Sequence, residues 1–409
     1  MNKLLHAILA IIMLTSCNDS NETANNSSET NKVENLLKQL DSPADSASTE
    51  PYLFSDKSGL VYLSWIEKTK DSSKLRFSVL NNEEWLEPNT IASGNNWFVN
   101  WADYPMLASE GNDLMAHILQ KSAEGTYTYD VKIITSSDKG KSWSDLKILH
   151  DDGKQAEHGF VSLIPYQDQF FVSWLDGRNT VSEKGETTVH HEGHNGPMSL
   201  RAAVVNKQGI KTAEWELDKR VCDCCQTSAA LTANGPVVIY RDRSEEEIRD
   251  ISIVRFVNGK WTEPQTIFPD QWKITGCPVN GPRADALGNN LAIAWFSSPD
   301  TTAQVNIIFS DDGGASFNKP IRINEEKAIG RVDLVMLDEK SAMVSWMEGA
   351  VIKAARVFKD GKKDPVVIIA YSSESRSSGF PQMTKAGNNL IFAWTNDKDK
   401  TIKVAKLAL

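Results

Sequence analysis

Long apolar segments are almost absent from this sequence. The one clear run covers residues 4–14, follows Lys3 and is interrupted only by His6. It is well short of the roughly 20 apolar residues that a membrane-spanning helix needs. A single Lys, a short apolar core and small residues before Cys17 are typical of a secretory signal. We therefore expect an exported chain whose signal occupies residues 1–17.

An excess of basic residues is also missing. The chain has 44 Lys and Arg against 54 Asp and Glu, a net charge of -10, and shows no basic stripe. This balance argues against a nucleic-acid partner. Residues 18–50 are rich in Asn, Ser, Glu and Thr and poor in apolar side chains, so we expect a solvated tether there. The folded body is predicted to cover residues 51–409 and to be a monomer.

Residues 14–17, Leu-Thr-Ser-Cys, resemble the lipobox of bacterial lipoproteins. The resemblance implies cleavage before Cys17 and acylation of its thiol. Several acyl chains on one residue hold a protein stably on a membrane, whereas one chain alone is marginal. The expected location is therefore the cell envelope, on the outer membrane or the cell surface. The alternative is an ordinary signal peptide that contains a cysteine.

Helical periodicity is nearly absent from the body, and a strand pattern repeats there about every 50 residues. Short apolar strands that end in an aromatic residue, with one weaker copy at residues 114–117, occupy residues 61–65, 171–174, 237–240, 291–295, 342–346 and 390–394. Turn residues and further strand patterns flank each copy. Four strands per repeat of this length are typical of a propeller blade. We predict an all-β fold, a single β-propeller of four-stranded blades, with seven blades and six as the alternative.

The last repeat ends at Leu409, after its third strand. Two outcomes are open for this blade. The ring is closed incompletely, or the tether supplies the missing strand.

Two turns between third and fourth strands share one pattern, Ser-x-Asp-x-Gly-x-x-aromatic, at residues 136–143 and 310–317, with a degenerate relative at 258–261. In such a turn the Asp accepts backbone N–H bonds, the Gly takes a positive φ and the aromatic ring packs beneath. This is the Asp-box, or BNR repeat. On these turns the chain resembles the sialidase superfamily over residues 51–409. The resemblance implies that the Asp-boxes are structural and lie far from the active site.

In a propeller, the innermost strands begin on the face where the second strands end, so side chains near those points converge at the mouth of the central channel. Loops at such a mouth commonly bind ligands. The residues at these points are rich in ionisable groups. The ligand-binding candidates on this face are Asp103, Tyr104, Asp176, Arg178, Arg283, Arg331 and Arg376.

The sialidase resemblance implies three Arg that clamp a carboxylate, a Tyr nucleophile paired with a Glu, and an Asp acid/base. Guanidinium groups suit this clamp because they bind carboxylates with two parallel bonds. The chain departs from the family in its first blade, where residues 50–54 lack the expected Arg-Ile-Pro motif. Tyr104, Tyr240 and Tyr371 are possible nucleophiles, but the sequence assigns no Glu–Tyr pair.

A charged run follows the fourth aromatic-ended strand. We predict a catalytic set there, with three arginines as anion holders and two carboxylates as their partners: Arg241, Asp242, Arg243, Glu247 and Arg249. The alternative is an exposed charged loop.

Apart from Cys17, four cysteines remain, and all lie just before neighbouring inner strands. One interpretation is a thiolate–imidazole site for copper or zinc, since soft ligands favour these metals. Its predicted ligands are Cys222, Cys224, Cys225, Cys277, His190, His191 and His194. The alternatives are disulfides, which an oxidising compartment favours, or buried free thiols.

The sequence thus predicts an envelope lipoprotein that binds or processes a glycan or another anionic ligand at the channel mouth. If it is an enzyme, the resemblance implies an exo-sialidase-like glycoside hydrolase. The alternative is a non-hydrolytic scaffold for metal binding or protein interaction that uses the cysteine cluster.

Overall fold

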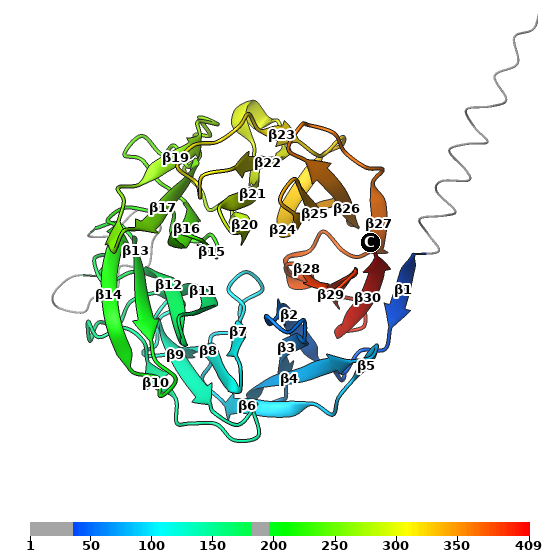
Figure 1. Cartoon of the computed structure of the whole chain (residues 1–409). Helices are drawn as coiled ribbons and strands as arrows, with labels where there is room; N and C mark the ends of the chain where they lie inside the picture. Colours follow the sequence, from blue (N-terminus) through cyan, green and yellow to red (C-terminus); the bar gives the residue numbers. More distant parts are fainter. Residues whose placement is uncertain (1–35, 182–195) are drawn as a thin grey trace, which may run out of the picture.

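The computed structural model describes residues 36–181 and 196–409 as seven small antiparallel sheets arranged around one axis (Figure 1). From the innermost strand outward, the first three blades are β2 (Ser48–Ser55), β3 (Val61–Lys68), β4 (Ser73–Asn81) with β5 (Glu84–Trp85) and β6 (Asn89–Gly94); β7 (Leu107–Glu110), β8 (Asp113–Lys121), β9 (Tyr129–Ser136) and β10 (Lys147–Ile148); and β11 (His158–Tyr166), β12 (Gln169–Asp176), β13 (Ser199–Val205) and β14 (Lys211–Asp218).

The next three blades continue the pattern. They are β15 (Ser228–Thr232), β16 (Gly235–Arg241), β17 (Ile251–Val257) with β18 (Lys260–Trp261) and β19 (Gln265–Phe268); β20 (Arg283–Leu287), β21 (Asn290–Ser297), β22 (Gln304–Ser310) and β23 (Ile321–Arg322); and β24 (Ala328–Asp338), β25 (Ser341–Glu348), β26 (Val351–Phe358) and β27 (Val367–Tyr371). Two short 3-10 turns, Pro299–Thr301 and Arg376–Ser378, lie in loops.

The seventh blade joins the two ends of the body. Its strands are β28 (Gln382–Ala386), β29 (Asn389–Asn396), β30 (Thr401–Ala408) and, outermost, β1 (Leu37–Leu40). β1 runs antiparallel to β30, with Leu37 opposite Leu407 and Leu40 opposite Val404. Of the two outcomes left open for this blade, the structure shows the second: a segment assigned to the tether supplies the missing strand.

The predicted boundary at residue 50 differs from the structure. Residues 37–40 form β1, and the boundary falls inside β2, which begins at Ser48. The sequence did not show this because β1 has only four residues, Leu-Lys-Gln-Leu, which do not alternate between apolar and polar. Its pairing with β30 identifies it as a strand.

All seven repeats, the six aromatic-ended strands and the weaker copy, are second strands of their blades, so the predicted seven-bladed, all-β propeller is confirmed. Their aromatic residues are buried between neighbouring sheets, and the tryptophans at 65, 174, 295 and 346 are among the largest fully buried side chains. This repeated burial of apolar area between blades stabilises the ring, at about 25 cal/mol per Å² removed from water.

Both Asp-boxes have the predicted geometry. In the first, Asp138 accepts the N–H of Ser142 (2.9 Å) and its hydroxyl (2.6 Å), and Gly140 has a φ of 80°. In the second, Asp312 accepts the same two bonds from Ser316, at 2.9 and 2.6 Å. The turns connect β9 to β10 and β22 to β23, on the side opposite the starts of the inner strands, so their role is structural.

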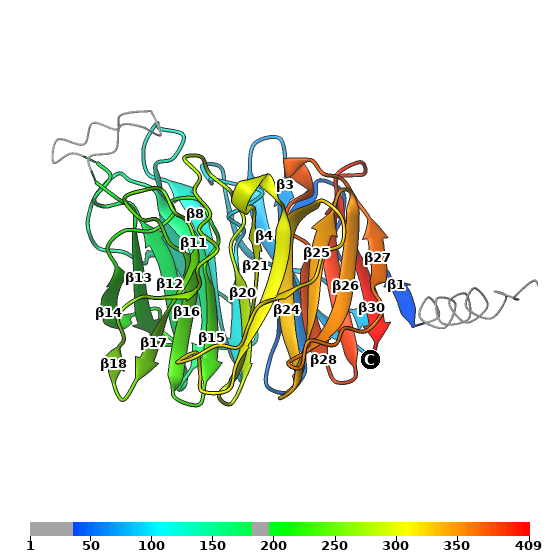
Figure 2. The same ribbon diagram turned by 90° about the horizontal axis from the view of Figure 1, so that it is seen from above.

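The predicted convergence of chain segments on one face is also confirmed. His158 at the start of β11 lies opposite Asp176 at the end of β12. In blade four, the N–H of Cys222 donates to the carbonyl of Arg241 (3.1 Å). The loops before the inner strands therefore gather on one side of the ring, at the top of Figure 2. In the described part of the chain, no helix is long and apolar enough to cross a membrane.

Closure by β1 can be tested with two proline variants. Ala408 donates its N–H to the carbonyl of Leu36 (3.1 Å), and hydrogen-bonded pairs alternate along an antiparallel ladder. The N–H of Lys38, opposite Lys406, therefore faces β30, and the N–H of Gln39 faces away. We expect Lys38→Pro to lower the free energy of unfolding in urea by roughly 1–3 kcal/mol. Gln39→Pro is the matched control with a smaller effect, and equal effects would contradict this pairing.

Candidate functional site

A pocket of about 350 Å³ opens on the face where the inner strands begin. We call it the mouth pocket. Its walls come from loops of several blades, and its main functional side chains are Trp101, Tyr129, Glu157, Asp223, Cys224, Cys277 and Arg376. Aromatic walls with a few converging polar groups are typical of small-molecule sites.

A larger hollow of about 750 Å³ has different chemistry. The described residues that line it include Trp215, Trp261 and Asn258, but no Asp, Glu, His, Cys, Lys or Arg. It therefore lacks the strong acids and bases from which catalytic sites are built. The mouth pocket is the better candidate for a reaction.

Trp101 forms one wall of the mouth pocket and is held by cations and an aromatic ring. The guanidinium of Arg331 lies 5.2 Å from the Trp101 ring centre and that of Arg376 lies 6.0 Å from it. Phe380 stacks on Trp101 at 5.6 Å with nearly parallel rings. Arg331 is buried and donates to Ser378 Oγ (2.6 Å), whereas Arg376 is exposed. Of the two cations, Arg376 is the one that can reach a ligand.

Three oxygen-bearing side chains, two of which line the mouth pocket, meet at its wall. Tyr129, at the start of β9, donates its hydroxyl to Glu157 Oε1 (2.8 Å) and lies 3.4 Å from Asp103 Oδ2. Asp103 is buried and accepts the N–H of Phe160 (2.8 Å). Phe98 stacks on the Tyr129 ring at 4.0 Å and fixes its orientation. Glu157 is partly exposed, so its carboxyl faces the pocket.

Burial shifts the pKa values of these groups far from their ordinary values. Desolvation, with the negative charges of Asp103, Asp223 and Cys277 nearby, raises the pKa of Glu157 to about 8, although the Tyr129 bond opposes the shift. Desolvation also raises the pKa of Asp103 to about 7. A carboxyl group with the pKa of Glu157 is mostly protonated at neutral pH and can donate its proton, whereas Asp103 is about half protonated there.

Asp223 has a different environment. Its Oδ2 accepts a bond from the guanidinium of Arg243 (3.0 Å), and Arg243 also pairs with Glu247 (2.7 Å). A guanidinium at this distance favours the charged form of a carboxylate. The mouth pocket therefore contains two carboxyl groups with different partners, since Glu157 bonds the Tyr129 hydroxyl and Asp223 pairs with the Arg243 guanidinium.

The four cysteines beyond Cys17 gather beside this pocket. The sulfur of Cys222 lies 3.8 Å from that of Cys224 and 3.6 Å from that of Cys225, and Cys277 contacts Cys224. All four are free thiols in this structure, and three of them have the spacing of metal ligands. Despite burial, contacts from Cys224 and Cys225 and the charge of Arg249 hold the pKa of Cys222 well below its usual value.

The conformation of a short loop before β20 explains how Cys277 reaches the other thiols. Gly281 packs against Gln226, and a Cβ at position 281 would collide with the Gln226 carbonyl. Only glycine therefore permits this close approach. It holds the loop that carries Cys277 against the segment that carries Cys222–Cys225.

The predicted catalytic role of Arg241 is corrected by its contacts. Arg241 is buried, and its guanidinium donates to the carbonyls of Asn280 (2.8 Å), Arg249 (2.6 Å) and Phe296 (2.6 Å). It also stacks over Trp272 at 4.9 Å. Its donors point at the backbone of three chain segments, so Arg241 acts as a structural clamp beneath the pocket. The sequence pattern could not show this because it does not reveal burial.

The rest of the predicted charged run surrounds the thiols. Arg249 donates to the Cys222 sulfur (3.2 Å) and to Glu247 (2.8 Å). Asp242 accepts bonds from the N–H of Arg243 (2.7 Å) and the hydroxyl of Ser252 (3.2 Å). The alternative of an exposed charged loop is therefore wrong for Arg249, which is buried.

Two of the ligand-binding candidates fill the centre of the ring. Arg283 contacts the hydroxyl of Tyr104, lies 3.3 Å from Gln382 Oε1 and is 3.6 Å from Asp333. Tyr104 stacks on Tyr52 at 6.2 Å. Arg283 and Tyr104 thus bind each other across the channel and lie outside the lining of the mouth pocket.

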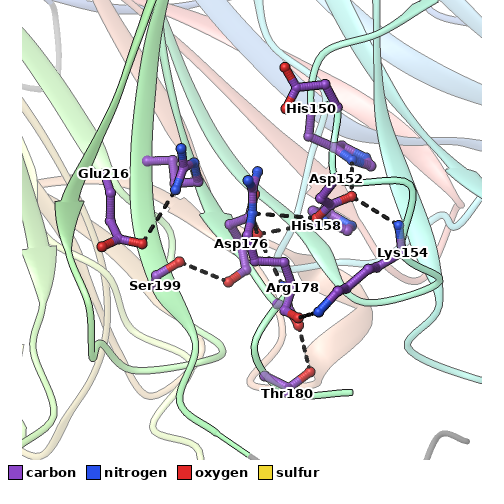
Figure 3. Close-up of polar contacts among 12 residues, drawn as sticks. His150, Asp152, Lys154, His158, Asp176, Arg178, Thr180, Ser199 and Glu216 are labelled. Carbon is purple, nitrogen blue, oxygen red and sulfur yellow. Dashed lines mark hydrogen bonds and ion pairs between the residues drawn. The ribbon is translucent and has the colours of Figure 1, made fainter. Parts of the chain in front are cut away.

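Asp176 and Arg178 belong to a buried ion-pair network between blades two and three (Figure 3). Arg178 bonds Asp176 (2.7 Å) and lies 3.4 Å from Asp152. Asp152 in turn bonds His158 (2.8 Å) and His150 (3.1 Å), and the two imidazole rings stack at 3.6 Å. Acid and imidazole atoms lie close enough here to hold a metal. Because Arg178 already neutralises two of the carboxylates, we assign this network to structure.

The other predicted residues are dispersed. The hydroxyl of Tyr240 donates to Asp218 (2.5 Å), and Tyr371 is 74% exposed at the outer strand β27. His190, His191, His194 and Cys17 lie outside the described residues.

Sequence reasoning missed the Tyr129–Glu157 pair. The available signal was that third strands also begin on the mouth face, as β9 does at Tyr129.

The clamp role of Arg241 predicts a loss of stability. Arg241→Met is expected to lower the free energy of unfolding by about 3 kcal/mol, because it leaves buried carbonyls without partners. Arg201→Met is the matched control, since Arg201 pairs with Glu214 (2.9 Å) on outer strands of blade three. Chemical denaturation of both variants checks this. Unchanged stability for Arg241→Met would contradict the clamp.

The ion-pair network predicts a pH dependence of stability. Burial would lower the pKa of His150, but bonds to Asp130 and Asp152 outweigh it and raise the pKa to about 9. A raised histidine pKa contributes stability below about pH 6.5 that disappears as pH rises through 9, here up to about 3 kcal/mol. We expect unfolding free energies measured over this window to fall. The His150→Gln variant should lose that slope, and a retained slope would contradict the assignment.

No protein-family model and no curated protein matches the sequence. Among solved structures, polysaccharide lyase Uly1 is 8% identical, with a TM-score of 0.51 over 88% of this chain and 90% of that chain. The K499G mutant of the NanB sialidase from Streptococcus pneumoniae is 13% identical. The match has a TM-score of 0.44 and covers 88% of this chain and 68% of that chain. Hadza microbial sialidase Hz136 is 12% identical, with a TM-score of 0.44, and the match covers 74% of this chain and 66% of that chain. The chain therefore spans about two thirds of the length of these two sialidases. At such identities the likeness concerns fold alone. In its fold, the chain is a seven-bladed β-propeller that is similar to the fold of polysaccharide lyase Uly1.

Proposed function

We propose that this protein cleaves an anionic glycan in the mouth pocket by acid–base chemistry. The observation that carries the proposal is the pair of carboxyl groups, Glu157 and Asp223, which line one pocket in opposite electrostatic settings. Two carboxyl groups of this kind are the usual machinery of glycoside hydrolysis. The fold supports the proposal only in a general way, since Uly1, which shares it, is a polysaccharide lyase.

Glu157 is the general acid in this proposal. Its raised pKa, about 8, keeps it protonated at neutral pH, and its partial exposure gives it access to a ligand. It donates its proton to the glycosidic oxygen as the bond from that oxygen to the anomeric carbon breaks. The hydroxyl of Tyr129, 2.8 Å from Oε1, holds the carboxyl in place. Such a positioned acid contributes about 10²–10⁴-fold to a rate.

Asp223 is the charged partner. With Arg243 at 3.0 Å, it remains a carboxylate and stabilises the positive charge that develops on the sugar ring. It then accepts the proton of the attacking water, whose hydroxyl group bonds to the anomeric carbon. The products are two shorter saccharides, and the net reaction consumes one water.

The remaining walls suit an acidic sugar. Arg376 is exposed at the rim and can pair with a carboxylate or sulfate group of the glycan. Trp101, whose ring centre lies 6.0 Å from the Arg376 guanidinium, is partly exposed and can contact a sugar ring. Arg331 and Arg283, two of the predicted ligand-binding candidates, are already bonded within the protein. We therefore propose an acidic polysaccharide as substrate, rather than a terminal sialic acid.

We also propose that the enzyme works at a membrane, held by acylated Cys17 in the cell envelope. A tethered propeller would meet polymers outside the cell. This part depends on the lipobox alone and can be checked by labelling cells with a radioactive fatty acid and recovering the protein with and without Cys17→Ser.

Glu157→Gln tests the proposed acid. Using acidic polysaccharides as substrates, we expect kcat to fall by about 10²–10⁴-fold with little change in KM, because the side chain keeps its shape but loses its proton. In the unmodified enzyme, activity should fall as pH rises through about 8, where Glu157 loses its proton in the field of Asp103, Asp223 and Cys277. Glu214→Gln, on an outer strand, is the control with unchanged kcat.

Product analysis separates this mechanism from others. Hydrolysis adds one water mass to each cut, whereas lyase elimination leaves an unsaturated sugar that absorbs ultraviolet light. Full activity of Glu157→Gln, or unsaturated products from the unmodified enzyme, would overturn the proposed mechanism.

A further inference from the structure

We propose that Cys222, Cys224, Cys225 and Cys277 together bind one thiophilic metal ion, zinc(II) or copper(I), in the wall of the mouth pocket. This inference goes beyond the proposed glycan chemistry and does not depend on it. Four cysteines from two chain segments form the site, and the contacts around the sulfurs carry the argument.

The spacing of the sulfurs is the first observation. Cys222 lies 3.8 Å from Cys224 and 3.6 Å from Cys225, and the three sulfurs all lie within 4.8 Å of one another. Tetrahedral ligands about 2.3 Å from a zinc ion are separated by about 3.8 Å. The observed separations therefore match thiolates that share one metal ion.

Chain geometry supports the same conclusion. Cys222, Cys224 and Cys225 occupy one tight segment between β14 and β15, where pairing of adjacent residues into a disulfide would be strained. Cys277 comes from the loop that Gly281 packs against Gln226, and its sulfur contacts Cys224. The fourth ligand thus comes from a chain segment about 50 residues away, as is common in structural thiolate sites.

The charge around the sulfurs is the second observation. Arg249 is 2% exposed and donates to the Cys222 sulfur (3.2 Å). Glu247 holds the other end of this guanidinium at 2.8 Å. A buried cation aimed at sulfur stabilises a thiolate, and the thiolate is the form that binds metals. Four thiolates with one zinc ion carry a charge of about -2, and Arg249 offsets part of it.

The ligand type selects the metal. Sulfur-only sites favour soft cations such as copper(I) and zinc(II), whereas magnesium and calcium require oxygen ligands. Cys222 and Cys225 are buried, but Cys277 is exposed, so an ion can enter from the mouth pocket. Because Cys224 and Cys277 also line that pocket, a bound metal would stabilise the wall beside Asp223.

The test is metal analysis of the full chain, purified without chelators under anaerobic conditions. We expect about one zinc or copper ion per chain after dialysis. Cobalt(II) added to metal-free protein should give the visible bands of a tetrahedral thiolate site if the site suits zinc. Transfer of copper(I) from a coloured chelator should be tight if it suits copper.

Variants define the ligands. Cys222→Ser and Cys277→Ser should each reduce metal retention at least tenfold, while Cys17→Ser, the cysteine control, should retain metal fully. Arg249→Met should weaken binding several-fold, and Arg201→Met should not. Thermal denaturation of each variant identifies any that fail to fold, and Cys277→Ser is the informative variant in that case, because Cys277 is exposed.

Two results would overturn the metal site. One is unmodified protein that contains no metal, takes up neither cobalt nor copper(I), and reacts equally fast with a thiol reagent before and after metal addition. The other is mass-spectrometric recovery of stoichiometric disulfides among the four cysteines from protein exported by cells. Glu157→Gln should bind metal like the unmodified protein, so this proposal and the glycan proposal can fail separately.

Discussion

The arrangement of this molecule depends on the antiparallel pairing of β1 with β30. That pairing joins the beginning of the folded chain to its end and gives the seventh blade its fourth strand. A closed ring fixes each blade against two neighbours and leaves only short, protected strand edges. As a result, loops separated by more than 200 residues, such as those that carry Trp101 and Arg376, meet at one opening. Every side chain of the mouth pocket depends on this closure.

At that opening, the protein combines two electrostatic environments. Around Tyr129 and Glu157, burial raises the pKa values of the Glu157 and Asp103 carboxyl groups. A few residues away, Arg243 and Arg249 neutralise Asp223 and the Cys222 sulfur. Charged and neutral forms of similar groups thus coexist in one small volume. This is the separation of roles that acid–base chemistry requires, and the proposed soft-metal site lies beside it.

The fold could be predicted because its signal repeats. Seven repeats of the second strand and two Asp-boxes each indicate the same blade structure. The weaker repeat at residues 114–117 is identified by its position between two clear ones. β1 could not be assigned, since a four-residue strand becomes recognisable only beside its partner. The convergence of the four cysteines was predicted from the register of the blades and is observed.

The site could be predicted only in part, because the sequence pattern does not show which side chains are buried or where they point. Arg241 looks like an anion holder in sequence, yet in the structure its guanidinium bonds backbone carbonyls. Glu157 went unnoticed beside His158, although neighbours on a strand point to opposite sides: His158 enters the ion-pair network and Glu157 faces the pocket.

A crystal structure with an acidic oligosaccharide bound is the most direct test. We expect a sugar beside Trp101, with its glycosidic oxygen within hydrogen-bond distance of Glu157. A sugar bound instead in the hollow beside Trp215 and Trp261 would contradict it.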